Sequence, residues 1–163
     1  MNQQQIDRLQ QSWIEKHVIG RALQIGCGMK PIAGAVNLDP NPDRRQYVDI
    51  AGDALLLPFQ DGAFDSVVSS HVVPHLHNPA QALREMARVL SPGGVMAHVI
   101  PDLRYAPRRR SDRYPFADQP FGWCGPDDFR PVMDDLSDVL CVVTLENFAE
   151  FNWSFKMVAV VLP

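Results

Sequence analysis

The segment from residue 22 to residue 42, ALQIGCGMKPIAGAVNLDPNP, constrains the fold more than any other part of the chain. Its first four residues form an apolar run of strand length, and Gly26 and Gly28 follow at once. Glycines let the backbone turn sharply where a Cβ would collide with a ligand. A second apolar run, residues 35–38, ends at Asp39. Since ligands of open parallel sheets bind outside the carboxyl ends of the strands, we expect Asp39 to accept hydrogen bonds from the hydroxyls of a ribose there.

A nicotinamide-dinucleotide domain is the main alternative for this segment. Its fingerprint is GxGxxG, with an acidic residue about 20 positions further on. Lys30 and Pro31 stand where the glycine pattern should continue, and Asp39 comes too early. Pro31 and Gly34 also leave no room for a helix whose N-terminus could bind a pyrophosphate. The sequence therefore disfavours a dinucleotide site here.

Further motifs follow in a fixed order: Asp53-Ala54, LPF at 57–59, DGAFD at 61–65, Ser70-His71 and ALREMARVLSPGG at 82–94. Together they make residues 22–102 resemble the class I S-adenosylmethionine-dependent methyltransferases. The resemblance implies that S-adenosylmethionine lies across the carboxyl ends of the first strands, with its ribose on Asp39 and its adenine near Asp53. The cofactor-binding residues that it implies are Gln24, Gly26, Cys27, Gly28, Asp39, Pro40, Asp53, Ala54, Ser70 and His71.

The length of 163 residues and the hydrophobic content of 46% suit one domain over residues 1–163. We expect an N-terminal helix at about 3–19, a cofactor-binding half at 20–102, and a substrate-side loop with late strands at 103–163. Ile6, Leu9, Trp13 and His17 form the apolar stripe of the first helix. Asn78 and Pro79 start a second helix, and a third is expected at 126–136.

The predicted sheet belongs to the α/β class. The expected strands are residues 22–25, 35–38, 48–51, 63–69, 95–100, 139–145 and 154–162. The resemblance implies a Rossmann-like, seven-stranded sheet that is mostly parallel, with an antiparallel late strand. Parallel strands normally need a crossover of about a dozen residues or more, so both early crossovers are contracted here.

Each candidate site residue also has a purely structural interpretation. Gly26 and Gly28 could form an ordinary turn after a strand. Asp39 could belong to a turn-forming Asp-Pro-Asn-Pro cluster, and Asp53 could cap the short turn that follows it. The strand-end position favours the cofactor role for Asp39, and the resemblance favours it for Asp53.

His71 is the first candidate for a catalytic base, needed if the methyl acceptor arrives protonated. His71, His75 and His77 form an H-x3-H-x-H cluster, but Pro74 interrupts the helix that would align the first two, so we expect no metal site. Two positions depart from the family pattern. Gln24 stands where an acidic or amide residue lies near the amino group of the cofactor, and Pro74 replaces a glutamate.

The function expected from the resemblance is methyl transfer to a small-molecule or saccharide-type acceptor. A formal net charge of -4 disfavours a nucleic-acid partner, and no apolar run approaches bilayer length. Three scattered cysteines point to the cytoplasm. The alternative is a cofactor-binding or inactive methyltransferase-like subunit with a protein partner, and a homo-oligomer is also open. The loop at 103–125 combines arginines with aromatic residues, which fits either a solvated loop or a ligand-binding lid.

Overall fold

The computed structural model describes residues 2–41, 43, 46–102, 126–148 and 154–163. The arginine-rich loop predicted at 103–125 lies outside the described residues.

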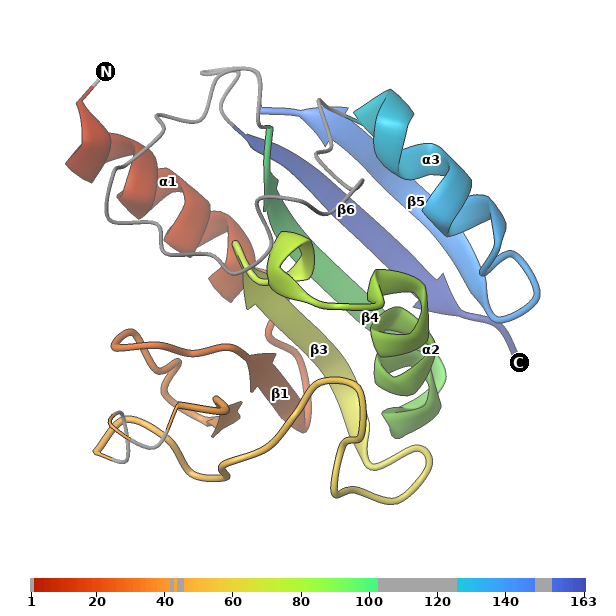
Figure 1. Ribbon diagram of the computed structural model, residues 1–163, viewed down its shortest axis with the longest axis horizontal. Coiled ribbons are helices and arrows are strands. Elements are labelled where there is room, and N and C mark those ends of the chain that lie inside the picture. The colour runs from red at the N-terminus through yellow and green to blue at the C-terminus, as the bar shows by residue number, and fades with distance from the viewer. Residues whose placement is uncertain (1, 42, 44–45, 103–125, 149–153) are drawn as a thin grey trace.

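The described part of the chain forms one six-stranded sheet in the order β2-β1-β3-β4-β6-β5 (Figure 1). The pairs among β2, β1, β3 and β4 are parallel, and β6 is antiparallel to both of its neighbours. This confirms the predicted α/β sheet, which is mostly parallel with a late antiparallel strand. The strands are β1 (Ala22–Ile25), β2 (Ala35–Leu38), β3 (Phe64–Ser70), β4 (Leu90–Pro101), β5 (Leu140–Asn147) and β6 (Ser154–Val161).

Helices cover both faces of the sheet. On one face, α2 (Pro79–Val89) and α3 (Pro126–Asp134) pack against side chains such as Leu23, Val67 and Met96. On the other face, α1 (Gln3–Glu15) packs against β3 and β4. As predicted, Asn78 caps α2, because its side-chain oxygen accepts a hydrogen bond from the Gln81 amide at 3.1 Å. A single 3-10 turn, η2 (Val73–His75), connects β3 to α2.

The contraction of the first crossover is confirmed. The strand β1 ends at Ile25 and β2 begins at Ala35, so the nine residues 26–34 connect them. None of these residues is helical. Even so, β1 and β2 are parallel and in register, with Ala22 opposite Ala35 and Ile25 opposite Leu38.

The strand predicted at residues 48–51 is not formed, so the sheet of the described residues has six of the seven predicted strands. Only Ile50 makes a parallel bridge, to Leu38. The physical reason lies in Asp49, whose carboxylate accepts hydrogen bonds from the backbone amide and the side-chain amide of Asn37, at 2.8 and 3.0 Å. The backbone bonds at this edge are those of the Asp49 and Ile50 amides to the Asn37 carbonyl, at 2.8 and 3.2 Å, and of the Asp39 amide to the Ile50 carbonyl, at 3.3 Å.

The first helix ends at Glu15 rather than near residue 19, and its predicted stripe is confirmed only in part, since Ile6 is buried and Trp13 packs half-buried against the core. Its buried residues are Ile6, Gln10 and Ile14, whereas Leu9 is 37% exposed. The difference arises because Gln10 lies in the stripe and forms a buried hydrogen bond to Ser154 on β6.

Candidate active site

The turn after β1 requires glycine. Gly26 and Gly28 have φ angles of 65° and 58°, in the left-handed region that side chains disfavour. The amide of Gly26 donates to the carbonyl of Leu38 at 2.7 Å, which draws the turn against the end of β2. A Cβ on Gly26 would lie 2.4 Å from Cγ2 of Val72, so the turn also packs closely on the segment after β3.

Asp39 holds this turn from the end of β2. Its side chain is 2% exposed, with Oδ2 accepting the Gly28 amide and Oδ1 accepting the Asn41 amide, both at 2.9 Å. Two backbone amides, one from the glycine turn and one from the segment after β2, therefore orient the carboxylate at the end of the strand.

The side chain of Gln24 braces the connection between the two strands. Its Oε1 accepts the Ile32 amide at 2.8 Å and its Nε2 donates to the Lys30 carbonyl at 3.1 Å. Asn37 binds the same connection from β2, with Oδ1 2.9 Å from the Ile32 amide. Both side chains are buried, and together they hold the connection between β1 and β2 from the two strands.

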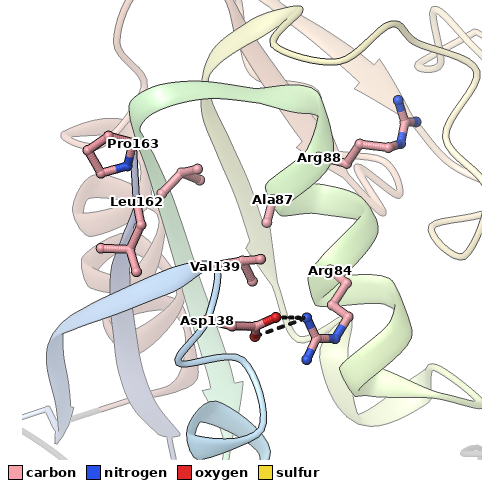
Figure 2. A pocket seen from close by; sticks show the side chains of 8 residues that line it. Arg84, Ala87, Arg88, Asp138, Val139, Leu162 and Pro163 are labelled. Atoms are coloured by element: carbon pink, nitrogen blue, oxygen red, sulfur yellow. Dashed lines mark hydrogen bonds and ion pairs between the residues drawn. The ribbon is translucent and has the colours of Figure 1, made fainter.

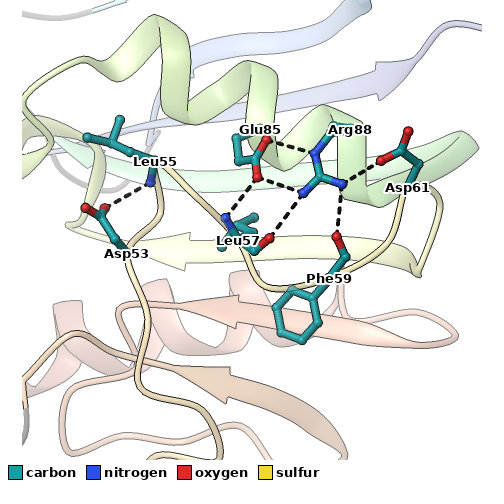
Figure 3. A network of polar contacts seen from close by, with 7 residues as sticks. All are labelled: Asp53, Leu55, Leu57, Phe59, Asp61, Glu85 and Arg88. Atoms are coloured by element: carbon teal, nitrogen blue, oxygen red, sulfur yellow. Dashed lines mark hydrogen bonds and ion pairs between the residues drawn. The ribbon is translucent and has the colours of Figure 1, made fainter.

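Asp53 caps the short turn that follows it, as the structural interpretation of this residue predicts. Oδ1 of Asp53 accepts the Leu55 amide at 2.9 Å, and the side chain is exposed (Figure 3). The segment before it lies against β2, because the Asp39 amide donates to the Ile50 carbonyl at 3.3 Å. Asp53 therefore starts a turn next to the end of β2, and Ala54 behind it is buried.

Two charged residues of α2 anchor the loop that follows Asp53. Arg88 donates to the carbonyls of Phe59 and Leu57, at 2.9 and 3.2 Å, and forms an ion pair with Asp61 at 2.6 Å (Figure 3). Glu85 pairs with Arg88 at 2.7 Å and accepts the Leu57 amide at 2.9 Å. The hydrogen bond from Arg88 lowers the pKa of Glu85, and the same carboxylate raises the pKa of Arg88.

His71 lies directly after β3 and has a backbone φ of 59°, the only positive value at a non-glycine residue of the described chain. Its amide donates to the Val99 carbonyl at 2.8 Å, and its Nε2 lies 3.3 Å from Oγ of Ser154. Such a backbone outlier is often found at functional sites. One side of the residue remains exposed, while Ser70 before it is half-buried.

The surroundings of His71 favour the neutral imidazole. Loss of hydration in the protein lowers the pKa of His71 to about 4, and the charge of Asp7 opposes this shift. His75 and Lys30 act in the same direction as the desolvation. These neighbours come from α1, η2 and the connection after β1, so His71 lies between three separate segments of the chain.

The remaining predicted site residues differ in exposure. Cys27 is 4% exposed, with its amide 3.2 Å from the Leu38 carbonyl and Sγ 3.5 Å from the Tyr47 carbonyl. Pro40 is exposed directly after Asp39. The turn at Gly26 and Gly28, together with Asp39 and Pro40, thus forms one unit at the strand ends. Asp53 and His71 flank it on separate segments.

A pocket of about 220 Å³ lies elsewhere, beside the last turns of α2 and the end of β6 (Figure 2). Arg84 at this pocket forms an ion pair with Asp138 at 2.9 Å. No predicted cofactor residue lines the pocket, so we assign it no part in the candidate site. Its lining residues are Arg84, Ala87, Arg88, Asp138, Val139, Val161, Leu162 and Pro163.

Among the residues whose positions are described, no three His, Cys, Asp or Glu side chains are gathered so that they could hold a metal ion. The described helices also include none that is long and apolar enough to cross a membrane.

Sequence reasoning missed three buried polar residues next to the site: Asn37, Gln10 and Ser154. Gln10 offered a signal, since it interrupts the apolar spacing between Ile6 and Ile14. A polar side chain in a buried helix stripe requires a hydrogen-bond partner. Ser154 carried no comparable signal, because a serine at the start of a strand is ordinary.

Comparison with known sequences connects this geometry to a family. Residues 23–98 match a family described as "Methyltransferase domain". The demethylmenaquinone methyltransferase of Renibacterium salmoninarum is 50% identical over 52 residues, which are 31% of this chain and 22% of that protein. The chain spans about a fifth of the length of the first curated relatives that it matches.

Solved structures share the fold over nearly the whole chain. A SAM-dependent methyltransferase from Aquifex aeolicus is 12% identical, with a TM-score of 0.68, over 99% of this chain and 100% of that chain. A complex of the Haloferax volcanii Trm112 methyltransferase activator with a protein named as a methyltransferase gives 18% identity and a TM-score of 0.67. This second match covers 94% of this chain and 89% of that chain.

Proposed function

Because the chain belongs to the class I S-adenosylmethionine-dependent methyltransferase family, we propose that it transfers the methyl group of S-adenosylmethionine to a small-molecule or saccharide-type acceptor. The observation that carries the proposal is the bond between the Asp39 carboxylate and the Gly28 amide at the ends of β1 and β2. This bond orients a candidate acceptor for ribose hydroxyls at the carboxyl ends of the strands, where ligands of open parallel sheets bind.

In this proposal the two parts of the cofactor meet different groups of the chain. Asp39 accepts hydrogen bonds from the ribose hydroxyls, and the turn at Gly26 and Gly28 lies along the methionine part. Asp53 and Ala54 border the adenine, while Ser70 and His71 border the reacting methyl group. Bound S-adenosylmethionine supplies a methyl group on a sulfonium that is already activated, so the protein mainly contributes alignment and the exclusion of water.

The chemistry of the chain supports an acceptor that is not a nucleic acid. The net charge of -4 gives no general attraction for a polyanion. The curated relatives in the comparison are named after small-molecule substrates, ajmaline and demethylmenaquinone. These names favour an active methyltransferase over the alternative of an inactive subunit. A protein partner stays compatible with the proposal, since one structural neighbour was solved with an activator protein. We also propose a cytoplasmic location, on the strength of the odd and scattered cysteines.

The first test of the proposal is calorimetric titration of the protein with S-adenosylhomocysteine, the demethylated cofactor. We expect binding by the wild type and a loss of affinity of about 10- to 100-fold in Asp39→Asn, since an amide cannot replace a carboxylate as a double acceptor. The matched control is Asp43→Asn, four residues further along and exposed. It should bind as the wild type does.

Circular dichroism of each variant confirms that the protein is folded before titration. A folded wild type that does not bind S-adenosylhomocysteine would contradict the proposal. Equal affinities of Asp39→Asn and Asp43→Asn would instead remove Asp39 from the site.

A further inference from the structure

A chain of three buried or half-enclosed polar side chains runs from α1 through β6 to His71. Nε2 of Gln10 donates to Oγ of Ser154 at 2.9 Å, and the same Oγ lies 3.3 Å from Nε2 of His71. Gln10 is 4% exposed and Ser154 is 1% exposed. Ser154 on β6 therefore contacts Nε2 of His71 directly, and Gln10 on α1 is connected to it through Ser154.

The direction of these hydrogen bonds follows from counting protons. A serine hydroxyl has one proton and two lone pairs. Gln10 occupies one lone pair of Ser154, and the hydroxyl proton needs an acceptor because the group is buried. Within the described chain, Nε2 of His71 is the one acceptor in hydrogen-bond contact with this hydroxyl. The Ser154 proton thus points at Nε2, which must be unprotonated to accept it.

We propose that Gln10 and Ser154 are positioning residues that hold His71 as its Nδ1–H tautomer, so that His71 offers a hydrogen-bond donor to the ligand instead of a base. His71 is exposed, and no described residue is hydrogen-bonded to its Nδ1. Its backbone is left-handed, with φ at 59°, and its Nε2 lies 3.3 Å from Oγ of Ser154. Such a bond on one ring nitrogen fixes the role of the other.

The charges around the ring are consistent with a neutral imidazole. Asp7 on α1 faces it and is paired with Lys30 of the glycine turn at 3.5 Å, so its negative charge is partly balanced. His75 of η2 adds a like charge when protonated. The low pKa of His71, about 4, which desolvation causes, keeps the ring uncharged at neutral pH.

A donor at this position changes what the site can do. An Nδ1–H group cannot remove a proton from a methyl acceptor, but it can bind an oxygen lone pair on the ligand. The inference rests on the proposed function for the identity of that ligand. The tautomer itself is a property of the protein alone, so its test and the titration with S-adenosylhomocysteine can fail independently.

The test is a long-range proton–nitrogen correlation spectrum of the uniformly 15N-labelled protein without ligand, at pH 7. The His71 signals are identified by their absence in His71→Asn. We expect a protonated Nδ1 and an unprotonated Nε2. The reverse pattern, with the proton on Nε2, would overturn the proposal, because it would mean that Ser154 donates to Gln10 and accepts from His71.

A variant then tests whether Gln10 sets the tautomer. Gln10→Glu has nearly the same shape but carries an acceptor where the amide donor stood, so the Ser154 hydroxyl should turn toward it. We expect the His71 proton to move to Nε2 in this variant and to stay on Nδ1 in the control Gln11→Glu, one residue along the same helix. An unchanged spectrum in Gln10→Glu would contradict the role of Gln10.

Two substitutions at Ser154 keep the test decisive if Gln10→Glu fails to fold. Ser154→Thr retains the hydroxyl and should retain the Nδ1–H form. Ser154→Ala removes the donor, and His71 should then show the mixture of tautomers of an unconstrained imidazole. A purely structural role for Ser154 predicts the same His71 spectrum in both variants, and that result would overturn the proposal.

Discussion

A second histidine lies inside the sheet, away from the candidate site. His98 on β4 is 0% exposed, and its Nδ1 is 2.6 Å from Oγ of Ser69 on β3. Its Nε2 has no hydrogen-bond partner among the described residues. An unpaired buried polar atom costs about 1–3 kcal/mol, and a charge in this position would cost more. Desolvation accordingly lowers the pKa of His98 to about 3.

This burial predicts a pH-dependent contribution to stability from His98. Below the unfolded pKa of about 6.5 the unfolded chain binds a proton that the folded chain does not, so the free energy of unfolding falls as the pH falls. The contribution of His98 is fully present above that pH. It declines by up to about 1.4 kcal/mol per pH unit on the way down to the folded pKa. Urea denaturation between pH 7 and pH 4.5 measures the free energy of unfolding. Its slope against pH should be smaller for His98→Gln than for the wild type.

The control for this experiment is His77→Gln, the same substitution at an exposed histidine. It should keep the slope of the wild type over this pH range. Equal slopes in His98→Gln and the wild type would show that His98 is protonated in the folded protein, contrary to the burial argument.

At the scale of elements, α2 holds the loop that follows Asp53. Two of its side chains, Arg88 and Glu85, bind the backbone of that loop. The side chain of Arg88 is 33% exposed and that of Glu85 is 15% exposed, so solvent screens this pair less than a fully exposed one. Removing Arg88 leaves the carbonyls of Leu57 and Phe59 without this donor. We expect Arg88→Ala to lower the free energy of unfolding by about 2 kcal/mol, measured by urea denaturation at pH 7.

Arg84→Ala is the matched control, one turn earlier on the same helix. Arg84 binds Asp138 at the surface, where the two side chains are 45% and 63% exposed. Exposed pairs contribute about 0–1 kcal/mol, so this variant should lose less than half of what Arg88→Ala loses. A larger loss in Arg84→Ala would show that the loop does not depend on the arginine that binds its carbonyls.

The sequence could predict those elements that local patterns specify. The apolar runs of β1 and β2, the glycine turn between them and the Asn78 cap of α2 are all present. The third strand could not be excluded from its sequence, because the pairing of residues 48–51 with β2 depends on contacts between segments, such as the bond that the Asn37 amide donates to the Asp49 carboxylate. The same limitation hid the contact between Gln10 and Ser154, which are 144 residues apart.

The candidate site was predictable only where chemistry and local pattern coincide. The position of Asp39 at a strand end was predictable, whereas its bond to the Gly28 amide was not, and its ribose-binding role stays a prediction. The roles of Gln24, Ser70 and His71 in cofactor binding remain predictions. For Gln24 the structure adds a bracing contact that its sequence context did not indicate.

In the molecule as a whole, the two halves of the sheet are held by different forces. The half that contains β3, β4 and β6 has fully buried side chains on both faces, such as Val67 and Met96 on one face and Val68 and Ala97 on the other. At the β2 edge, Val36 is only half-buried, and the side-chain amides of Gln24 and Asn37 replace a crossover helix. A hydrogen bond contributes only about 0.5–1.5 kcal/mol in water. We therefore expect local opening to cost less free energy at this edge than in the apolar half of the sheet.

The difference predicts an uneven pattern of amide hydrogen exchange. Amides of β2 and the turn at Gly26 and Gly28 should open at least about 1.4 kcal/mol more easily than those of β4, which is a tenfold faster exchange. Saturating S-adenosylhomocysteine should slow exchange at Gly28 and Asn41, the two amides that Asp39 accepts, because a ligand stabilises the state that binds it. Exchange at the centre of β4, such as at Ala97, serves as the internal reference. If β2 exchanges as slowly as β4 without ligand, the amide-braced edge is as stable as the apolar core, and the contracted crossover carries no cost in local stability.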